Sequence, residues 1–306
     1  MSRHNVLSVS LLAAVVVATS VASASCARRR ASTQPSASPS VTVTVGGSVL
    51  TTARPSVTPV PTPSRSPTPS ASHSRTPTPT ATTPSGPPTV PAGLRGKDIE
   101  VIPTSRRIVA LTFDGGANAD GLASILATLD RDDVTATFFL TGDFARNYPA
   151  SVKAIVARGH RLGNHTATHP HLPALPSDAA IVSQLRVAEA QIRAAGGTDP
   201  RPLFRFPYGD RNSHTIAVVN GAGYVALRWT VDSLGWKGTT KGGITAQLVV
   251  ERVVAAARPG EIVLMHVGSN PDDHTTLDAQ ALPTVIARLR SLGYGFVTLD
   301  ALVAAR

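Results

Sequence analysis

Two histidines separated by three residues, His165 and His169, are the first feature of the chain that could do chemistry. On a helical turn this spacing places both imidazoles on one face, where neutral ring nitrogens can bind a borderline-soft cation such as zinc. The same pattern also fits polar residues of a surface loop. The pair therefore predicts a metal site only if other reactive side chains accompany it.

Four other stretches accompany the pair, and each follows an apolar run that could form a strand. They are Thr-Phe-Asp-Gly-Gly at 112–116, Arg-Phe-Pro-Tyr-Gly at 205–209, Val-Asp-Ser-Leu-Gly-Trp at 231–236 and Leu-Met-His at 264–266. Asp114 could act as a general base toward a water made more acidic by a nearby cation. Arg205 could keep Asp114 ionised through a two-pronged hydrogen bond. His266 could protonate a leaving group, with Asp232 raising its basicity.

The remaining residues of these stretches would shape the site. Tyr208 follows a proline in a turn whose backbone N–H could stabilise an oxyanion. Trp236 and Leu264 could form apolar walls, although both could equally belong to the core. Structural alternatives exist for the polar residues too, since Arg205 could form an ordinary ion pair and His266 could be a satisfied buried histidine.

Alternating strands and helices would position these motifs. Short apolar runs predict strands at 108–113, 134–140, 161–164, 203–205, 224–230, 261–266 and 296–299. Longer runs between them predict helices at 121–129, 149–158, 177–194, 213–222, 245–257 and 281–292. This alternation implies an α/β fold with a parallel sheet, either a small barrel or a doubly wound sheet. In a barrel, the carboxyl ends of the strands would bring the candidate residues to one mouth.

Taken in order, the motifs Thr-Phe-Asp, His-x-x-x-His, Arg-x-Pro-Tyr, Asp-x-x-x-Trp and Leu-x-His resemble those of the polysaccharide deacetylase family. This is carbohydrate esterase family 4, with its NodB-homology domain. The resemblance covers residues 106–300. It implies a distorted (β/α) barrel of about seven parallel strands and the metal-dependent removal of N-acetyl groups from a sugar polymer.

The resemblance also assigns roles, residue by residue. It implies that His165 and His169 hold a divalent metal, with zinc the expected ion, and that Asp114 is the base. Arg205 would orient Asp114, and Asp232 would tune His266, the acid. The Tyr208 N–H would share the oxyanion with the metal, while Trp236 and Leu264 would shape the pocket for the acetyl methyl.

One position departs from the family pattern. The family usually follows the base with a second aspartate that completes the metal site, whereas this chain has Gly115. Glycine has no side chain to ligate a metal. The two histidines and waters would then complete the site alone, or Asn118 or Asp120 would reach into it.

The N-terminal third does not read as a folded domain. A basic start, an apolar core at 6–18 and an Ala-x-Ala exit predict a signal peptide over 1–26. Cys26, the single cysteine, resembles the acylated cysteine of bacterial lipoproteins; alternatively, the segment stays uncleaved as a membrane anchor. Residues 27–97 are rich in Ser, Thr and Pro and predict a disordered linker, so the catalytic domain is expected at 98–306.

The net charge of +10 does not indicate a nucleic-acid partner. Residues 1–97 contain nine Lys or Arg and no Asp or Glu, which leaves 20 basic and 19 acidic side chains in the nearly neutral remainder. The resemblance and the predicted signal peptide together imply an extracytoplasmic enzyme that acts on cell-wall peptidoglycan or a chitin-like glycan, and we expect it to be a monomer. A non-catalytic glycan-binding module and an esterase that removes O-acetyl groups from xylan are the alternatives.

Overall fold

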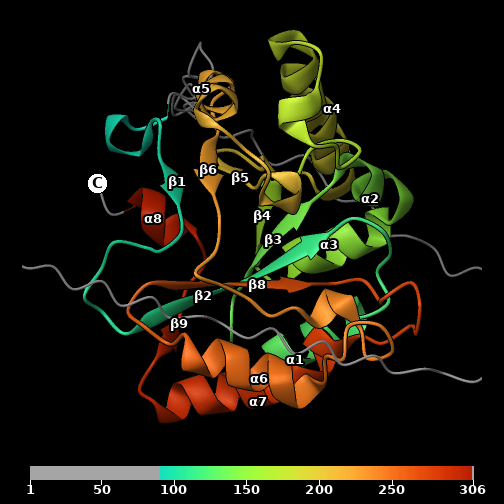
Figure 1. Ribbon diagram of the computed structural model, residues 1–306, viewed down its shortest axis with the longest axis vertical. Coiled ribbons are helices and arrows are strands. Elements are labelled where there is room, and N and C mark those ends of the chain that lie inside the picture. The colour runs from blue at the N-terminus through green and yellow to red at the C-terminus, as the bar shows by residue number, and fades with distance from the viewer. Residues whose placement is uncertain (1–89, 305–306) are drawn as a thin grey trace, which may run out of the picture. The chain divides into compact units, whose positions relative to one another are not determined.

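The computed structural model describes residues 90–304 (Figure 1). The predicted signal peptide, and the predicted linker up to residue 89, lie outside the described residues. The sequence predicts a linker that includes residues 90–97, but these residues belong to the folded part. Val90 and Leu94 are buried and pack with Ile99 and Leu227 in one apolar cluster. The predicted boundary at residue 98 is therefore too late, because two large apolar side chains suffice to anchor this stretch to the core.

Parallel strands form the centre of the described part. Their order is β1-β6-β5-β4-β3-β2-β8-β7, and β9 pairs with the start of β2. The strands are β1 (Asp98–Ile99), β2 (Ile108–Gly115), β3 (Thr137–Leu140), β4 (Arg161–Asn164), β5 (Leu203–Phe204), β6 (Val225–Leu227), β7 (Val231–Asp232), β8 (Glu261–His266) and β9 (Gly295–Phe296). The segment after β1 returns to β8, where Val101 forms an antiparallel bridge with Glu261. The predicted distorted (β/α) barrel is confirmed.

Helices follow most strands and cover the sheet from outside. They are α1 (Leu122–Arg131), α2 (Gly142–Asn147), α3 (Pro149–Ala157), α4 (Asp178–Gly196), α5 (Ser213–Gly221), α6 (Ala246–Ala255), α7 (Leu277–Ser291) and α8 (Asp300–Ala304). Figure 1 shows α6 and α7 lying side by side next to β2 and β8, whereas α2, α3 and α4 form a second group. Among residues 90–304, no helix is long and apolar enough to cross a bilayer.

The helix starts follow local sequence signals. Thr141, Ser177 and Thr245 each accept a hydrogen bond from a backbone N–H of the first turn of α2, α4 and α6. Asn212 forms a reciprocal capping box at the start of α5. These caps fix where each helix begins relative to the strand before it.

The two central strands are the most deeply buried. Every residue of β2 is buried, and β8 is buried as far as Met265. A parallel strand that has helices on one side and the barrel interior on the other must be apolar on both faces. Asp114 and His266, at the ends of these two strands, are therefore held on a rigid support.

Candidate active site

Eight of the nine predicted site residues line one cavity of about 630 Å³. They are Asp114, His165, His169, Tyr208, Asp232, Trp236, Leu264 and His266. The parallel arrangement explains the convergence, because all strands deliver their carboxyl ends to the same side of the sheet. Asp114 and His266 are direct neighbours in the β2–β8 register. The ninth residue, Arg205, lies behind Asp114.

The Arg205 guanidinium is fully buried against the base candidate. Its Nη1 donates to Asp114 Oδ1 at 2.7 Å, and its Nη2 donates to the Arg228 carbonyl at 3.0 Å. The guanidinium also lies 4.2 Å from the centre of the Phe139 ring. The two-pronged hydrogen bond predicted for this pair is thus wrong: one prong goes to Asp114 and the other to a backbone carbonyl.

Asp114 is held in its ionised form. Burial alone would raise the pKa of this carboxyl, but Arg205, His165 and His266 outweigh burial and lower the pKa below its usual value. Asp114 is therefore a carboxylate at neutral pH, the form that a general base requires.

The two imidazoles of the His-x-x-x-His motif face each other across 3.1 Å between their Nε2 atoms. His165 Nδ1 lies 2.8 Å from the Arg205 carbonyl, so this nitrogen carries the proton and Nε2 keeps its lone pair. The same Nε2 lies 3.5 Å from Asp114 Oδ2. Burial lowers the pKa of both histidines, that of His169 to about 4, so both rings are neutral at pH 7.

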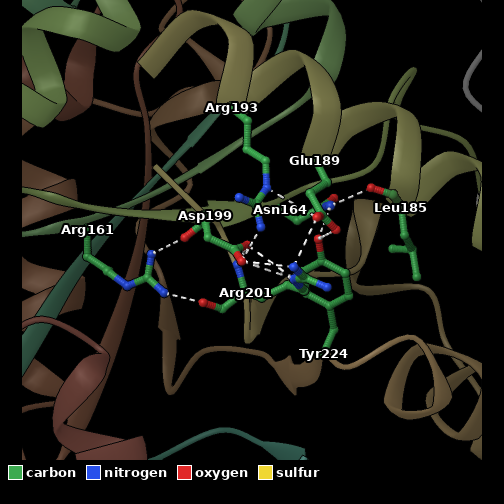
Figure 2. A network of polar contacts seen from close by, with 8 residues as sticks. All are labelled: Arg161, Asn164, Leu185, Glu189, Arg193, Asp199, Arg201 and Tyr224. Carbon is green, nitrogen blue, oxygen red and sulfur yellow. Dashed lines mark hydrogen bonds and ion pairs between the residues drawn. The ribbon is translucent and has the colours of Figure 1, made fainter. Parts of the chain in front are cut away.

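The motif forms a loop and not the helical turn that its spacing suggested. Thr166 and His169 have φ angles of 68° and 60°, in the left-handed region. Buried Asn164 holds the loop, since its Oδ1 accepts the Thr166 N–H and its Nδ2 donates to the Leu185 carbonyl and the Tyr224 hydroxyl. Figure 2 shows the wider network, in which the Tyr224 hydroxyl donates to Glu189 of α4 at 3.0 Å.

Gly115, at the position of the family's second aspartate, is closely surrounded by apolar side chains. A Cβ on Gly115 would lie 2.8 Å from Leu140 Cδ2 and 3.1 Å from Val267 Cγ2. Neither Asn118 nor Asp120 lines the cavity; their side chains accept hydrogen bonds from Ser269 at 2.8 Å and 2.6 Å. They tie two loops together and do not replace the missing ligand.

The described residues thus supply two possible metal ligands but not a complete set. Within residues 90–304, no group of three or more His, Cys, Asp or Glu side chains has the geometry of a complete ligand set. Two neutral imidazoles with facing Nε2 atoms nevertheless suit a cation, because two facing lone pairs repel unless a proton or a cation lies between them. His165 and His169 are the side chains that would hold it.

The charge of Asp232 contributes to the raised pKa of the acid candidate, His266, but the hydrogen bonds that Asp232 accepts come from other groups. Asp232 accepts hydrogen bonds from the Leu234 N–H at 2.8 Å and from Trp236 Nε1 at 3.3 Å. His266 instead has Asp278 beside it, whose Oδ2 accepts the His266 backbone N–H at 2.8 Å. The sequence does not single out Asp278, because an acid in the first turn of a helix indicates only a favourable charge at the helix N-terminus.

Aromatic side chains form the mouth of the cavity. Tyr208 and Trp236 are 62% and 47% exposed, and Phe206 and Trp229 line the wall. Tyr208 has a φ of 58°, and its ring stacks on His171 with 4.1 Å between centroids. Exposed rings around a polar floor suit the apolar faces of sugars. Leu264 is buried and also lines the cavity.

Comparison with known proteins identifies the family. Residues 102–227 match the family model described as polysaccharide deacetylase. The peptidoglycan-N-acetylglucosamine deacetylase of Bacillus cereus is 33% identical over 200 residues, which cover 65% of this chain and 70% of that protein. The chain belongs to the polysaccharide deacetylase family.

Two further relatives extend the comparison. The chitooligosaccharide deacetylase of Sinorhizobium fredii is 35% identical over 184 residues, covering 60% of this chain and 83% of that one. The solved structure of a carbohydrate esterase family 4 pseudoenzyme from Bacillus anthracis has a TM-score of 0.62 at 30% identity, covering 69% of this chain and 70% of that one. The predicted family and fold are confirmed, and the relatives from Bacillus cereus and Sinorhizobium fredii are both named as deacetylases of carbohydrates.

Proposed function

We propose that the protein is an exported, metal-dependent N-deacetylase of a cell-wall glycan. One observation carries this proposal: a carboxylate, Asp114, and an imidazole, His266, lie in adjacent register and line the same cavity as a pair of facing histidines. A base and an acid that line the same cavity are what the hydrolysis of an amide requires.

The chain's own groups can perform the proton transfers. Asp114 would accept a proton from a water as that water attacks the acetyl carbonyl. His266 would donate a proton to the amine nitrogen as the carbon–nitrogen bond breaks, which releases acetate and the free amine. The Tyr208 backbone N–H would donate to the oxyanion formed in between.

A divalent metal would be held by His165 and His169, with zinc the expected ion because both ligands are neutral imidazoles. When bound, it would supply Lewis acidity to the attacking water and the acetyl oxygen. The Arg205 carbonyl fixes the tautomer of His165, which leaves Nε2 free to ligate.

Cell-wall peptidoglycan or a chitin-like glycan is the proposed substrate. The exposed rings of Tyr208 and Trp236 support a sugar polymer, and two relatives are named for N-acetylated glycans. The predicted signal peptide supports export, and Cys26 or the N-terminal apolar segment would tether the protein to the outer face of the membrane. A linker of about 60 residues would span on the order of 190 Å when fully extended, enough to reach wall polymer.

Acetate release from purified substrates tests the proposal. The wild-type protein and an Asp114→Asn control would be supplied with zinc and given N-acetylglucosamine oligomers, peptidoglycan and acetylated xylan. We expect release from one of the first two by the wild type alone. Release from xylan alone would favour the esterase, and no release from any polymer with any divalent metal would reject catalysis.

A non-catalytic glycan-binding module is the second candidate. Gly115 and its packed surroundings favour it, as does the similarity to a pseudoenzyme. In this case wild type and Asp114→Asn would bind insoluble glycan equally well in a pull-down assay, and neither would release acetate.

A further inference from the structure

Asp278 is a buried carboxylate that none of the roles above uses. It lies in the first turn of α7, is 3% exposed, and sits behind His266 at the end of β8. A carboxylate at this position of a helix ordinarily interacts with the N–H groups of its own helix. The Asp278 carboxylate instead accepts the backbone N–H of His266 on the neighbouring strand.

The imidazole of His266 also faces this carboxylate. His266 Nδ1 lies 3.7 Å from Asp278 Oδ2, an ion-pair distance that is too long for a hydrogen bond. His266 Nδ1 and Asp278 Oδ1 are both buried, and in the described part of the chain neither has a hydrogen-bond partner. Unpaired buried polar atoms are costly, and a small rotation of the imidazole would pair Nδ1 with the carboxylate.

The surroundings make room for this carboxylate. A Cβ on Gly235 would lie 2.3 Å from Asp278 Oδ1. The turn after β7 therefore needs a glycine at this point if Asp278 is to point toward His266. Asp232 is the carboxylate predicted to raise the basicity of His266. Its two oxygens instead accept hydrogen bonds from the Leu234 N–H and from Trp236 Nε1.

We propose that Asp278 is the positioning residue for His266: it holds the proton on Nδ1, directs Nε2 into the cavity and stabilises the protonated ring. This inference deepens the proposed function and depends on it for the role of the ring in acid catalysis. Asp232 then orients Trp236 in the wall of the cavity.

Several charged groups surround the imidazole of His266. Asp278 faces it from α7, Asp114 from β2 and Asp232 from β7, while His165 and His169 approach from the loop after β4. Burial lowers the pKa of His266, but the three carboxylates outweigh burial and the pKa is raised. Among these carboxylates, Asp278 is the one that accepts a hydrogen bond from His266, through the backbone N–H.

Replacing Asp278 by asparagine in the full chain tests the proposal, because asparagine keeps the shape and an acceptor for the His266 N–H. We expect kcat to fall about 10- to 100-fold with KM unchanged. The alkaline limb of the kcat profile should move to lower pH by about one unit or more. Glu261→Gln, which replaces a buried acid at the opposite end of β8 from His266, is the matched control and should leave this limb in place. An unchanged alkaline limb in Asp278→Asn would overturn the proposal.

The tautomer of His266 in the wild type gives a test that depends neither on turnover nor on the stability of Asp278→Asn. Nitrogen-15 NMR, with His266→Gln used to assign the ring, should show the neutral imidazole protonated at Nδ1. Protonation at Nε2 would overturn the proposal. If no substrate is deacetylated but the ring has the Nδ1–H tautomer and its pKa drops in Asp278→Asn, the proposed function fails while the pairing stands.

Discussion

Replacing Arg205 by methionine is the perturbation with the clearest consequences. The guanidinium is completely buried, donates to Asp114 at 2.7 Å and lies over the Phe139 ring. Methionine keeps the packing volume but leaves the Asp114 carboxylate buried without its ion pair. Breaking a buried pair by removing one partner costs about 3–5 kcal/mol of unfolding free energy.

The pKa of Asp114 determines how this loss depends on pH. In the wild type the pKa is lowered, so the pair stabilises the fold above the usual pKa of an aspartate, and this stability disappears as the pH falls through the lowered value. In Arg205→Met, burial is opposed much less and the pKa rises. The variant should then lose stability as the pH increases from about 4 toward neutrality. Its rate of acetate release should be restored in part at alkaline pH, where Asp114 ionises again.

A double-mutant cycle measures the pairing directly. Unfolding free energies by urea denaturation would be compared for the wild type, Asp114→Asn, Arg205→Met and the double variant. We expect a coupling of about 2 kcal/mol or more at pH 7, because the double variant has no unpaired charge. Additive single effects would refute the interpretation that Arg205 holds Asp114 ionised.

Three further predictions concern separate parts of the domain. Burial without hydrogen bonds raises the pKa of Glu261 to about 8, so wild-type stability should fall by about 3 kcal/mol relative to Glu261→Gln between pH 5 and pH 8; parallel stability curves in urea titrations would contradict this. Gly115→Asp should lose about 2 kcal/mol or more by overpacking Leu140 and Val267, and calorimetric zinc titration should show no tighter binding; a tighter site would mean that the aspartate reaches the cavity. Trp236→Ala should raise KM for a glycan oligomer about fivefold, with kcat and the melting temperature nearly unchanged; an unchanged KM would place the ring outside the substrate path.

The sequence was most informative where one strand is buried on both faces. The predicted ranges 161–164 and 261–266 coincide with β4 and β8. For β8 the reason is a continuous apolar run, Ile262 to Met265, that follows Gly260 and leaves little choice of register. The site residues on or directly after these strands could therefore be placed at one end of a sheet before any geometry was known.

Features that depend on tertiary contacts could not be predicted. α2 has six residues, including Gly142, so its intrinsic helix propensity is too weak to predict it from the sequence. Packing against α4 stabilises this helix. The loop form of the histidine motif depends on Asn164 and on Gln184 of α4, whose Oε1 accepts two backbone N–H groups of that loop. Asp278 lies on a different element from His266, and no local spacing relates the two.

The measurement that bears most directly on the active site is acetate release from an N-acetylglucosamine oligomer by chelator-treated protein, before and after zinc is added back. If Asp114, His266 and the two facing histidines act together around one cation, chelation should abolish release and zinc should restore it in the wild type. Zinc should not restore release in His165→Ala or in His169→Ala. Undiminished release after chelation, or wild-type release by either variant, would contradict the account.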